Sequence, residues 1–196
     1  MLIRCFDDDL RIEQATTSEE VQRWREPFVA LYPRIFADPP YDEAITAEEA
    51  AATWDYLTSV RDHITLLAID GDDHLVGFGI AIPLTATRLV AASLAGLVPY
   101  KHTYYLAELG VLPAWRGRGL GRALVQERIK RMDHDKYSHV VLRVSGSRSP
   151  SWDLYAEMGF EDMGVYMEVN ARRNDGSNTA DQRLFLSRVL SQVDLE

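Results

Sequence analysis

A strand-like apolar run that leads into a glycine- and arginine-rich loop, and then into a helical pattern, constrains this chain more than any other feature. The apolar run covers residues 104–113, and the loop reads Arg116-Gly117-Arg118-Gly119-Leu120-Gly121-Arg122. Glycines remove Cβ atoms where a backbone turns sharply, so consecutive N–H groups can point into one space. Apolar residues then recur at mainly helical spacing, at Ala123, Leu124, Ile129 and Met132.

Such a loop is expected to bind an anion. Unpaired amides and the positive end of the helix dipole favour negative charge at a helix N-terminus, and three arginines add formal charge there. The glycines lack the Gly-x-Gly-x-x-Gly spacing of a dinucleotide fingerprint, and no Gly-Lys-Ser/Thr follows as in a nucleotide-triphosphate loop. A pyrophosphate is the expected ligand, and a glycine-rich turn with surface arginines is the alternative.

Arg116, Gly119 and Gly121 match the pattern Arg/Gln-x-x-Gly-x-Gly/Ala, and Leu109-x-Val111-x-Pro113 precedes them. This stretch resembles the acetyl-CoA-binding motif of the GNAT N-acetyltransferase superfamily. The resemblance implies that acetyl-CoA is a cosubstrate. The residues that it implies for binding are Leu109, Gly110, Val111, Arg116, Gly117, Arg118, Gly119, Leu120, Gly121, Arg122, Ser151 and Tyr155.

A second match lies downstream. Residues 139–145 read as a buried strand, residues 146–150 as a turn-rich loop, and residues 151–160 as a short helix ended by Gly159. The helix resembles the Leu-Tyr-x-x-x-Gly-Phe element of the same family. The resemblance implies that Tyr155 stands near the thioester sulfur and protonates the departing CoA thiolate. A tyrosine buried in the core is the alternative.

The chain departs from the family pattern about seven residues before Tyr155. Family members often carry an asparagine there that hydrogen-bonds the pantetheine arm, whereas this chain has Arg148. Ser147, Ser149 or Ser151 could supply a hydroxyl instead. Serines in a loop that contains a proline are also ordinary turn formers.

Glu108 is a carboxylate inside an otherwise apolar strand. It is the candidate general base for an amine acceptor, because burial would raise its pKa towards a useful value. The alternatives are a ligand for the acceptor ammonium or an outward-facing strand residue. A backbone N–H near residues 109–111, where the family strand bulges, is expected to polarise the thioester carbonyl, and His102 is a second candidate base.

The element order resembles that of the GNAT fold over nearly the whole chain. The expected order is a strand at residues 10–14, two helices capped at Thr17 and Thr46, a hairpin of residues 63–69 and 75–83, and then the elements above. Pro27 is expected to bend or divide the first helix. The predicted fold class is α+β: a mixed, mostly antiparallel sheet flanked by helices, with splayed strands at the CoA site. We expect one domain, residues 1–196, with a core of about residues 10–190.

The C-terminal part is expected to form an antiparallel pair from residues 165–169 and 183–189, joined by a polar segment, residues 170–181. A helix beginning at Thr179 is the competing interpretation. Residues 85–102, which exceed a usual strand connection, and Pro39-Pro40-Tyr41 are the candidate walls of the acceptor site, with plain packing as the alternative.

The composition bounds the function classes. A net charge of −9 argues against nonspecific nucleic-acid binding, which needs a basic surface. No apolar run approaches the roughly 18 residues of a membrane span and no secretory signal is evident, so a cytoplasmic location is expected. The single cysteine, Cys5, cannot form an internal disulfide, and the histidines show no metal-ligand spacing, so no metal is expected. Arg128 to Arg131 are interpreted as a solvated helix face.

These observations predict an enzyme that transfers an acetyl group from acetyl-CoA to a primary amine on a small, cationic molecule. A protein lysine or N-terminal acetyltransferase is the first alternative. A noncatalytic acyl-CoA-binding module is the second. No membrane or nucleic-acid partner is expected, and a homodimer is left open.

Overall fold

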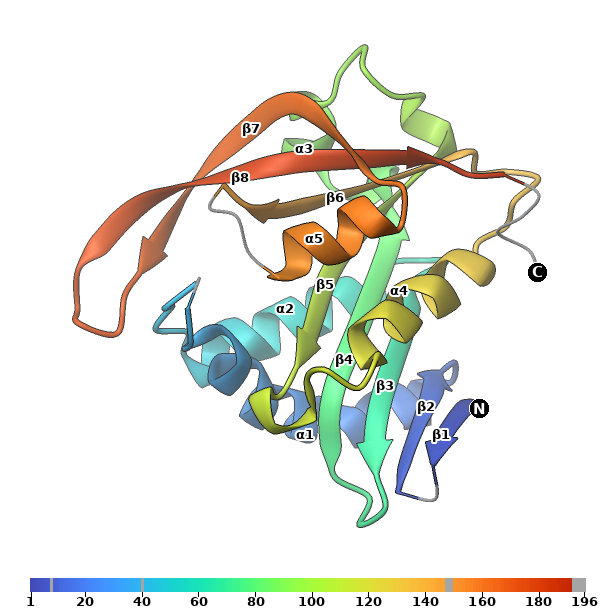
Figure 1. Ribbon diagram of the computed structural model, residues 1–196, viewed down its shortest axis with the longest axis vertical. Helices are drawn as coiled ribbons and strands as arrows, with labels where there is room; N and C mark the ends of the chain where they lie inside the picture. The colour runs from blue at the N-terminus through green and yellow to red at the C-terminus, as the bar shows by residue number, and fades with distance from the viewer. Residues whose placement is uncertain (8, 40, 147–149, 192–196) are drawn as a thin grey trace.

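The computed structural model describes residues 1–7, 9–39, 41–146 and 150–191. Within them, eight strands form one sheet in the order β1-β2-β3-β4-β5-β6-β8-β7 (Figure 1). The strands are β1 (Leu2–Asp7), β2 (Leu10–Ala15), β3 (Ile64–Asp70), β4 (Leu75–Pro83), β5 (Thr103–Val111), β6 (His139–Ser145), β7 (Glu161–Arg172) and β8 (Asn178–Val189). The α-helices are α1 (Ser18–Phe36), α2 (Ala47–Ser59), α3 (Arg88–Ser93), α4 (Leu120–Lys130) and α5 (Pro150–Glu157).

The pairing of β5 with β6 distinguishes the middle of the sheet. The other neighbouring strands pair antiparallel, whereas β5 and β6 are parallel and pair only from Thr103↔His139 to Leu106↔Leu142. Beyond Leu106, β5 continues along β4 while β6 follows β8, so the two strands diverge (Figure 1). The prediction of a mixed, mostly antiparallel sheet with splayed strands is confirmed.

Helices cover both faces of this sheet. The first hydrophobic core lies under α4 and α5 and includes Tyr104 and Leu106 of β5, whereas the second lies under α1 and α2 and includes Tyr105 (Figure 1). Successive side chains of a strand point to opposite faces, so β5 contributes to both cores. The gap between the diverging strands β5 and β6 therefore opens to both faces of the sheet. We call the face covered by α4 and α5 the α4/α5 side and the face covered by α1 and α2 the α1/α2 side.

The first two helices begin where the sequence predicts. Thr17 with Glu20, and Thr46 with Glu49, each form a capping box that satisfies backbone N–H groups at the helix start. The prediction that Pro27 divides the first helix is wrong, because α1 runs unbroken past it to Phe36. Burial of one apolar side of α1 against the sheet offsets the hydrogen bond that proline removes. Its buried residues are Trp24, Phe28, Leu31, Tyr32, Ile35 and Phe36.

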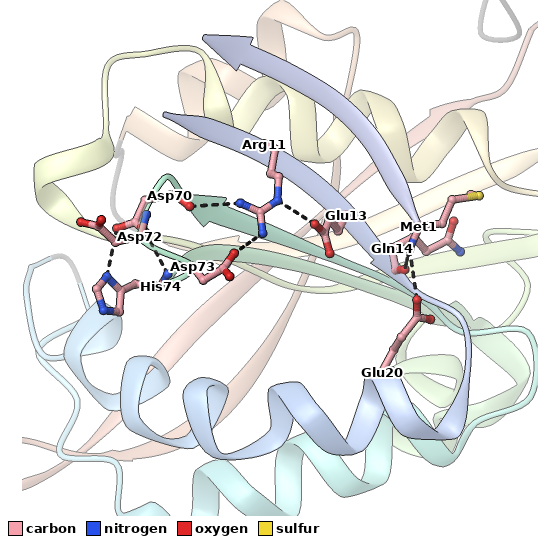
Figure 2. Close-up of polar contacts among 9 residues, drawn as sticks. All are labelled: Met1, Arg11, Glu13, Gln14, Glu20, Asp70, Asp72, Asp73 and His74. Carbon is pink, nitrogen blue, oxygen red and sulfur yellow. Dashed lines mark hydrogen bonds and ion pairs between the residues drawn. The ribbon is translucent and has the colours of Figure 1, made fainter. Parts of the chain in front are cut away.

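The N-terminal strand β1 was not predicted, because most of its residues are exposed and its pattern shows no buried face. It pairs with β2 at the sheet edge. Figure 2 shows the ion pairs there: the Arg11 guanidinium donates to Glu13 (2.7 Å), to the Asp70 carbonyl oxygen (3.2 Å) and to Asp73. We call Arg11, Glu13, Asp70 and Asp73 the edge cluster.

The C-terminal prediction is wrong in detail. Residues 170–181 were expected to be a loop, or part of a helix from Thr179, yet β7 extends to Arg172 and β8 begins at Asn178. The strands extend beyond the helices as a hairpin (Figure 1) whose pairing includes Asn170↔Ala180 and Arg172↔Asn178. Backbone pairing in an exposed hairpin needs no buried apolar face, so an alternation of hydrophobic residues does not reveal it.

The connection from β4 to β5 is locally ordered. It contains the 3₁₀ turn Leu84–Ala86, α3 and the 3₁₀ turn Tyr100–His102. Among the residues described, no helix combines the length and apolarity needed to cross a membrane.

Candidate active site

A cavity of about 720 Å³ occupies the splay between β5 and β6. Its walls include Leu109, Gly110 and Val111 of β5 and Arg143 of β6. N–H groups alternate between the two sides of a strand, so β5 presents some of them towards β6 beyond Leu106, where the β5–β6 pairing has ended. The predicted residues Leu109, Gly110 and Val111 are therefore placed where backbone groups can bind a ligand.

The glycine-rich loop borders the same cavity. Gly117 and Gly119 have φ of +77° and +80°, in the left-handed region that favours glycine, and Gly119 is the N-cap of α4. A Cβ at either position would meet no atom within 4 Å, so the backbone conformation, not lack of space, requires glycine there. The cavity is lined by six of the predicted loop residues: Arg116, Gly117, Gly119, Leu120, Gly121 and Arg122.

The three loop arginines differ in placement. The Nε of Arg116 donates to the Val111 carbonyl oxygen (2.9 Å) and ties the loop to β5. Arg122 forms an ion pair with Glu157 of α5. Arg118 does not line the cavity, and its guanidinium lies 4.7 Å from the centre of the Trp115 ring. The structure therefore brings Arg116 and Arg122 to the cavity and leaves Arg118 on the surface of the loop.

Tyr155 lies on the α4/α5 side, buried against Phe160, and lines the cavity as expected. Burial raises the pKa of its hydroxyl to about 12, an effect that the nearby Arg128 guanidinium partly opposes. The hydroxyl therefore carries its proton at neutral pH. A protonated phenol in this place can donate to a leaving thiolate.

Arg128 of α4 contradicts the prediction of a solvated helix face, because it is completely buried. Its Nε donates to its own helix at the Leu124 carbonyl oxygen (3.0 Å), and its Nη1 donates to the carbonyl oxygens of Ile80 (3.0 Å) and Glu108 (2.9 Å). Gly79 makes room, since a Cβ there would stand 2.9 Å from Nε. Burial lowers the pKa of Arg128 to about 10, which leaves it charged at neutral pH.

A bulge in β5 turns Glu108 towards the α1/α2 side. The register of β4 with β5 shifts between Ile80↔Glu108 and Ala81↔Leu106, so Ala107 is the extra residue. Regular alternation from Tyr105, which faces α1 and α2, would point Glu108 to the opposite face. The bulge was expected nearer residues 109–111. Its position at Ala107 aims Glu108 at Tyr32 of α1, whose hydroxyl acts to lower the pKa of the carboxyl.

The environment of Glu108 suits a general base. Burial raises the pKa of its carboxyl to about 7, although the Arg143 guanidinium and the Tyr32 hydroxyl act in the opposite direction. The side chain lines the cavity and is not an outward-facing strand residue. A carboxylate that titrates near neutrality can accept a proton from an ammonium or amine.

Other residues on this side gave no signal in the sequence, because they come from elements far apart in the chain. They are Tyr32 of α1, Glu43 before α2, Tyr105 of β5, Arg143 of β6 and Arg183 of β8. Arg183 is buried, pairs with Glu43 and with Asp181 (3.2 Å), and lies 4.9 Å from the centre of the Tyr41 ring. Pro39 and Tyr41 of the predicted wall line the cavity, whereas Pro40 is outside the described residues.

A second cavity, of about 360 Å³, adjoins the first on the α1/α2 side, and both are lined by Tyr105, Ala107, Glu108 and Arg143. The walls of the second include Thr53 and Leu57 of α2 together with Thr87 and Val90. The predicted wall of residues 85–102 thus contributes its first part. His102 lines neither cavity, and its Nδ1 hydrogen-bonds the Lys136 carbonyl oxygen (2.7 Å), which removes it as a candidate base.

Ser151 of α5 lines the main cavity, as predicted. Ser147, Arg148 and Ser149, the other candidates for a pantetheine contact, lie outside the described residues. Within the part of the chain that the structure describes, no three His, Cys, Asp or Glu side chains are grouped so that they could hold a metal ion.

Comparisons with known proteins agree with this geometry. Residues 21–160 match the model of the acetyltransferase (GNAT) family. A mycothiol acetyltransferase from Acidothermus cellulolyticus is 29% identical over 161 residues, which are 81% of this chain and 46% of that protein. The chain thus spans about half the length of that curated relative.

Two solved structures share the fold. A putative acetyltransferase, YncA, from Salmonella typhimurium, solved with acetyl-CoA, has a TM-score of 0.65 at 14% identity and covers 93% of this chain and 95% of its own. A GNAT superfamily phosphinothricin acetyltransferase from Sinorhizobium meliloti, in complex with acetyl-CoA, also has a TM-score of 0.65, at 18% identity, over 93% of this chain and 89% of its own. With the match to the family model, the splayed sheet and the glycine loop, these findings show that the chain belongs to the acetyltransferase (GNAT) family.

Proposed function

We propose that this chain is an N-acetyltransferase that moves the acetyl group of acetyl-CoA to a primary amine on a small molecule, the amine arriving as a cationic ammonium. The observation that carries the proposal is the cavity in the splay, which brings a phosphate-type loop, Tyr155 and Glu108 together. The acidic composition, with a net charge of −9, favours the approach of a cation. The proposal takes residues 1–196 as one catalytic domain and includes a cytoplasmic location.

The residues present fit acetyl-CoA as a substrate. The loop offers two glycines in left-handed conformations, open space where their Cβ atoms would be, and the N-terminus of α4. These features suit a pyrophosphate. The cavity continues from the loop along β5 to Tyr155 and Glu108, which gives an extended pantetheine arm and its thioester a continuous path.

In the proposed reaction the amine nitrogen forms a bond to the thioester carbonyl carbon as the C–S bond breaks. The ammonium first releases one proton to solvent, and Glu108 then accepts, from the α1/α2 side, the second proton that the nitrogen loses as the bond forms. Tyr155 supplies a proton to the sulfur from the α4/α5 side and is reprotonated from solvent. After Glu108 returns its proton to solvent, the products are an N-acetylated amine, CoA thiol and one net proton, so atoms and charge balance. Polarisation of the carbonyl by N–H groups of β5 beyond Leu106 would stabilise the developing oxyanion.

The matched glycine variants Gly119→Val and Gly176→Val test the assignment of the loop. Both positions have positive φ, +80° in the loop and +85° in the β7–β8 turn, so both substitutions strain the backbone by similar amounts. We expect Gly119→Val to weaken acetyl-CoA binding at least tenfold in calorimetry, whereas Gly176→Val binds as the wild type does. Equal affinity in all three proteins would remove the loop from the site.

An assay of CoA thiol release tests the activity. Wild-type protein is incubated with acetyl-CoA and a panel of amino acids, diamines, amino sugars and lysine-containing peptides. We expect release with small amines and little with peptides, because the second cavity is walled by α2 and residues 87–90. Release only with peptides would favour a protein acetyltransferase. Tight acetyl-CoA binding with no release for any amine would favour a noncatalytic acyl-CoA-binding module.

A further inference from the structure

Arg143 is a charged group that the proposed reaction does not use. It projects from β6 to the α1/α2 side and lines both cavities. Its Nε donates to the Tyr105 hydroxyl (2.7 Å) and its Nη1 lies 3.2 Å from the Met167 sulfur. These contacts use two of the five N–H groups of a guanidinium. Among the described residues, no carboxylate forms an ion pair with it.

The other guanidiniums near this side already have oxygen acceptors, although Nη2 of Arg128 and Nη1 of Arg183 have no hydrogen-bond partner among the described residues. Arg183 pairs with Glu43 and Asp181, and Arg173 pairs with Asp181. Arg128 is occupied by backbone carbonyl oxygens. Arg143 therefore differs in holding its charge beside a cavity without a carboxylate partner. A guanidinium in that position presents planar N–H groups that match a carboxylate.

Glu108 does not serve as that partner. It forms no ion pair with Arg143 in this structure, and burial raises the pKa of its carboxyl to about 7 in spite of the nearby guanidinium. Near neutral pH the Glu108 carboxyl group is therefore partly protonated and partly ionised.

The topology places Arg143 and Glu108 side by side. Leu106↔Leu142 is the last β5–β6 pair, Arg143 is the next residue of β6, and Glu108 follows the bulged Ala107 on β5. Both side chains face the α1/α2 side and line both cavities. A guanidinium cation and a proton acceptor thus lie together where β5 and β6 begin to diverge. A molecule that carries an amine and an acid group a few bonds apart matches that arrangement.

We propose that the acceptor is a zwitterionic amino acid whose carboxylate binds the Arg143 guanidinium while its amine faces Glu108. The inference rests on the proposed N-acetyltransferase function and names its substrate class. The second cavity, lined largely by apolar atoms of Ala52, Leu57, Ile82 and Val90, receives the side chain of that amino acid. An apolar side chain of modest size suits such a pocket.

The test compares the kcat/KM of wild-type protein for apolar amino acids, for their carboxamides and for the corresponding amines without a carboxyl group. The carboxamide keeps the size and the amine and lacks only the negative charge. We expect the free acids to be preferred about 10- to 100-fold, the range of a charge-assisted hydrogen-bond pair. The difference should lie mainly in KM, because binding of the carboxylate is shared by ground and transition states.

Two variants of Arg143 test whether this residue causes the preference for free acids over carboxamides. Arg143→Met should remove it, so that free acids and carboxamides are used with equal kcat/KM, whereas Arg143→Lys should restore part of it. Thermal melting of both variants checks that they fold. The wild-type comparison stands even if Arg143→Met does not fold.

Three results would overturn the inference: equal wild-type use of acids and carboxamides, a preference that persists in Arg143→Met, or a uniform fall of kcat for every amine in that variant. The last would show that Arg143 acts on the thioester or through Glu108, whose pKa its guanidinium lowers, and not on a carboxylate of the acceptor. In each of these cases amines are still acetylated and the proposed function survives. If no amine is acetylated and acetyl-CoA does not bind, the proposed function itself fails.

Discussion

Two groups of charges in this molecule are built in opposite ways. In the edge cluster, Arg11 donates to Glu13, Asp73 and the Asp70 carbonyl oxygen, and the partner side chains Glu13 and Asp73 are 25% and 62% exposed (Figure 2). At the splay, Arg128 is fully buried, while Glu108 and Arg143 line cavities without an ion pair between them.

We infer that the difference separates a structural arrangement from a functional one. Paired charges near the surface contribute little to stability, typically about 0 to 1 kcal/mol, and cost little to maintain. A charge such as that of Glu108, which has no ionic partner among the described residues, reduces stability because it loses hydration that no opposite charge replaces, whereas Arg128 donates hydrogen bonds to carbonyl oxygens. Charged groups of this kind beside a cavity are candidates for a functional site. Substitutions in the edge cluster and at the splay are therefore expected to have different effects.

The largest effect is expected for Tyr155→Phe. Loss of the proton donor should slow turnover by about 10²- to 10⁴-fold while acetyl-CoA affinity stays near the wild-type value. Tyr104→Phe is the matched control, because it also removes a buried tyrosine hydroxyl, one that donates to the Asp62 carbonyl oxygen and lies outside both cavities. Steady-state kinetics and calorimetry measure both quantities. Equal turnover of the two variants would remove Tyr155 from the reaction.

Arg128→Met should cost about 2–4 kcal/mol of unfolding free energy. It leaves the carbonyl oxygens of Ile80 and Glu108 without their donor, and an unsatisfied buried acceptor costs about 1–3 kcal/mol. Urea unfolding at pH 7 measures the change. A loss below about 1 kcal/mol would mean that water replaces the guanidinium, and the β4–β5 bulge would then not depend on it.

Glu108→Gln should stabilise the protein at high pH. The pKa of Glu108 is about 7 in the folded state against a reference of 4.5, so wild-type stability falls as pH rises between these values and stays reduced above pH 7. At about 1.4 kcal/mol per pKa unit, the gain from glutamine reaches at most about 3 kcal/mol above pH 7 and vanishes below pH 4.5. Unfolding measured from pH 4 to pH 9 gives this curve.

Glu20→Gln supplies a control of opposite sign. Hydrogen bonds from the backbone and side chain around Thr16 and Thr17 lower the pKa of Glu20 to about 2. Its stabilising effect is therefore present above pH 4.5 and is lost as pH falls towards 2. The glutamine variant should be less stable than wild type at neutral pH. If both variants shifted stability in the same direction, the contrast between the surface and the splay would not hold.

The smallest effect is expected for Arg11→Met. Its ion pairs lie at the sheet edge, so we expect a loss below about 1 kcal/mol that shrinks further in 1 M salt. Turnover should not change. A loss as large as that of Arg128→Met would show that the edge cluster carries the stability of the β1–β2 hairpin.

The sequence predicted the fold where its signals are local. The capping boxes at Thr17 and Thr46, the hairpin around residues 70–74 and the loop before α4 each depend on neighbouring residues, and each is confirmed. The sequence did not predict β1, and it predicted the antiparallel β7–β8 pair without the extension of both strands into residues 170–181. Both stretches are mostly exposed, so no alternation of buried residues marks them. In the candidate site, the sequence also predicted the glycine-rich loop and Tyr155, because each belongs to a motif contained in one short segment of the chain.

The rest of the site depends on contacts between distant elements. Arg128 lies in a run of basic residues that resembles a solvated face, and Gly79 of β4, far away in the sequence, makes room for its side chain. Arg143 and Glu108 meet because one bulged residue, Ala107, changes the face on which Glu108 lies. The spacing of residues within one helix or one strand predicts neither the burial of Arg128 nor the proximity of Arg143 to Glu108.

The pH dependence of kcat/KM in wild type and Glu108→Gln tests most directly whether the buried charges of the splay serve catalysis. With a preferred acceptor, the wild type should gain activity through a limb centred near pH 7, where Glu108 loses its proton. The variant should be slower by about 10²- to 10⁴-fold and should lack that limb, leaving only the ionisation of the amine. An unchanged limb at an unchanged rate in Glu108→Gln would contradict the account.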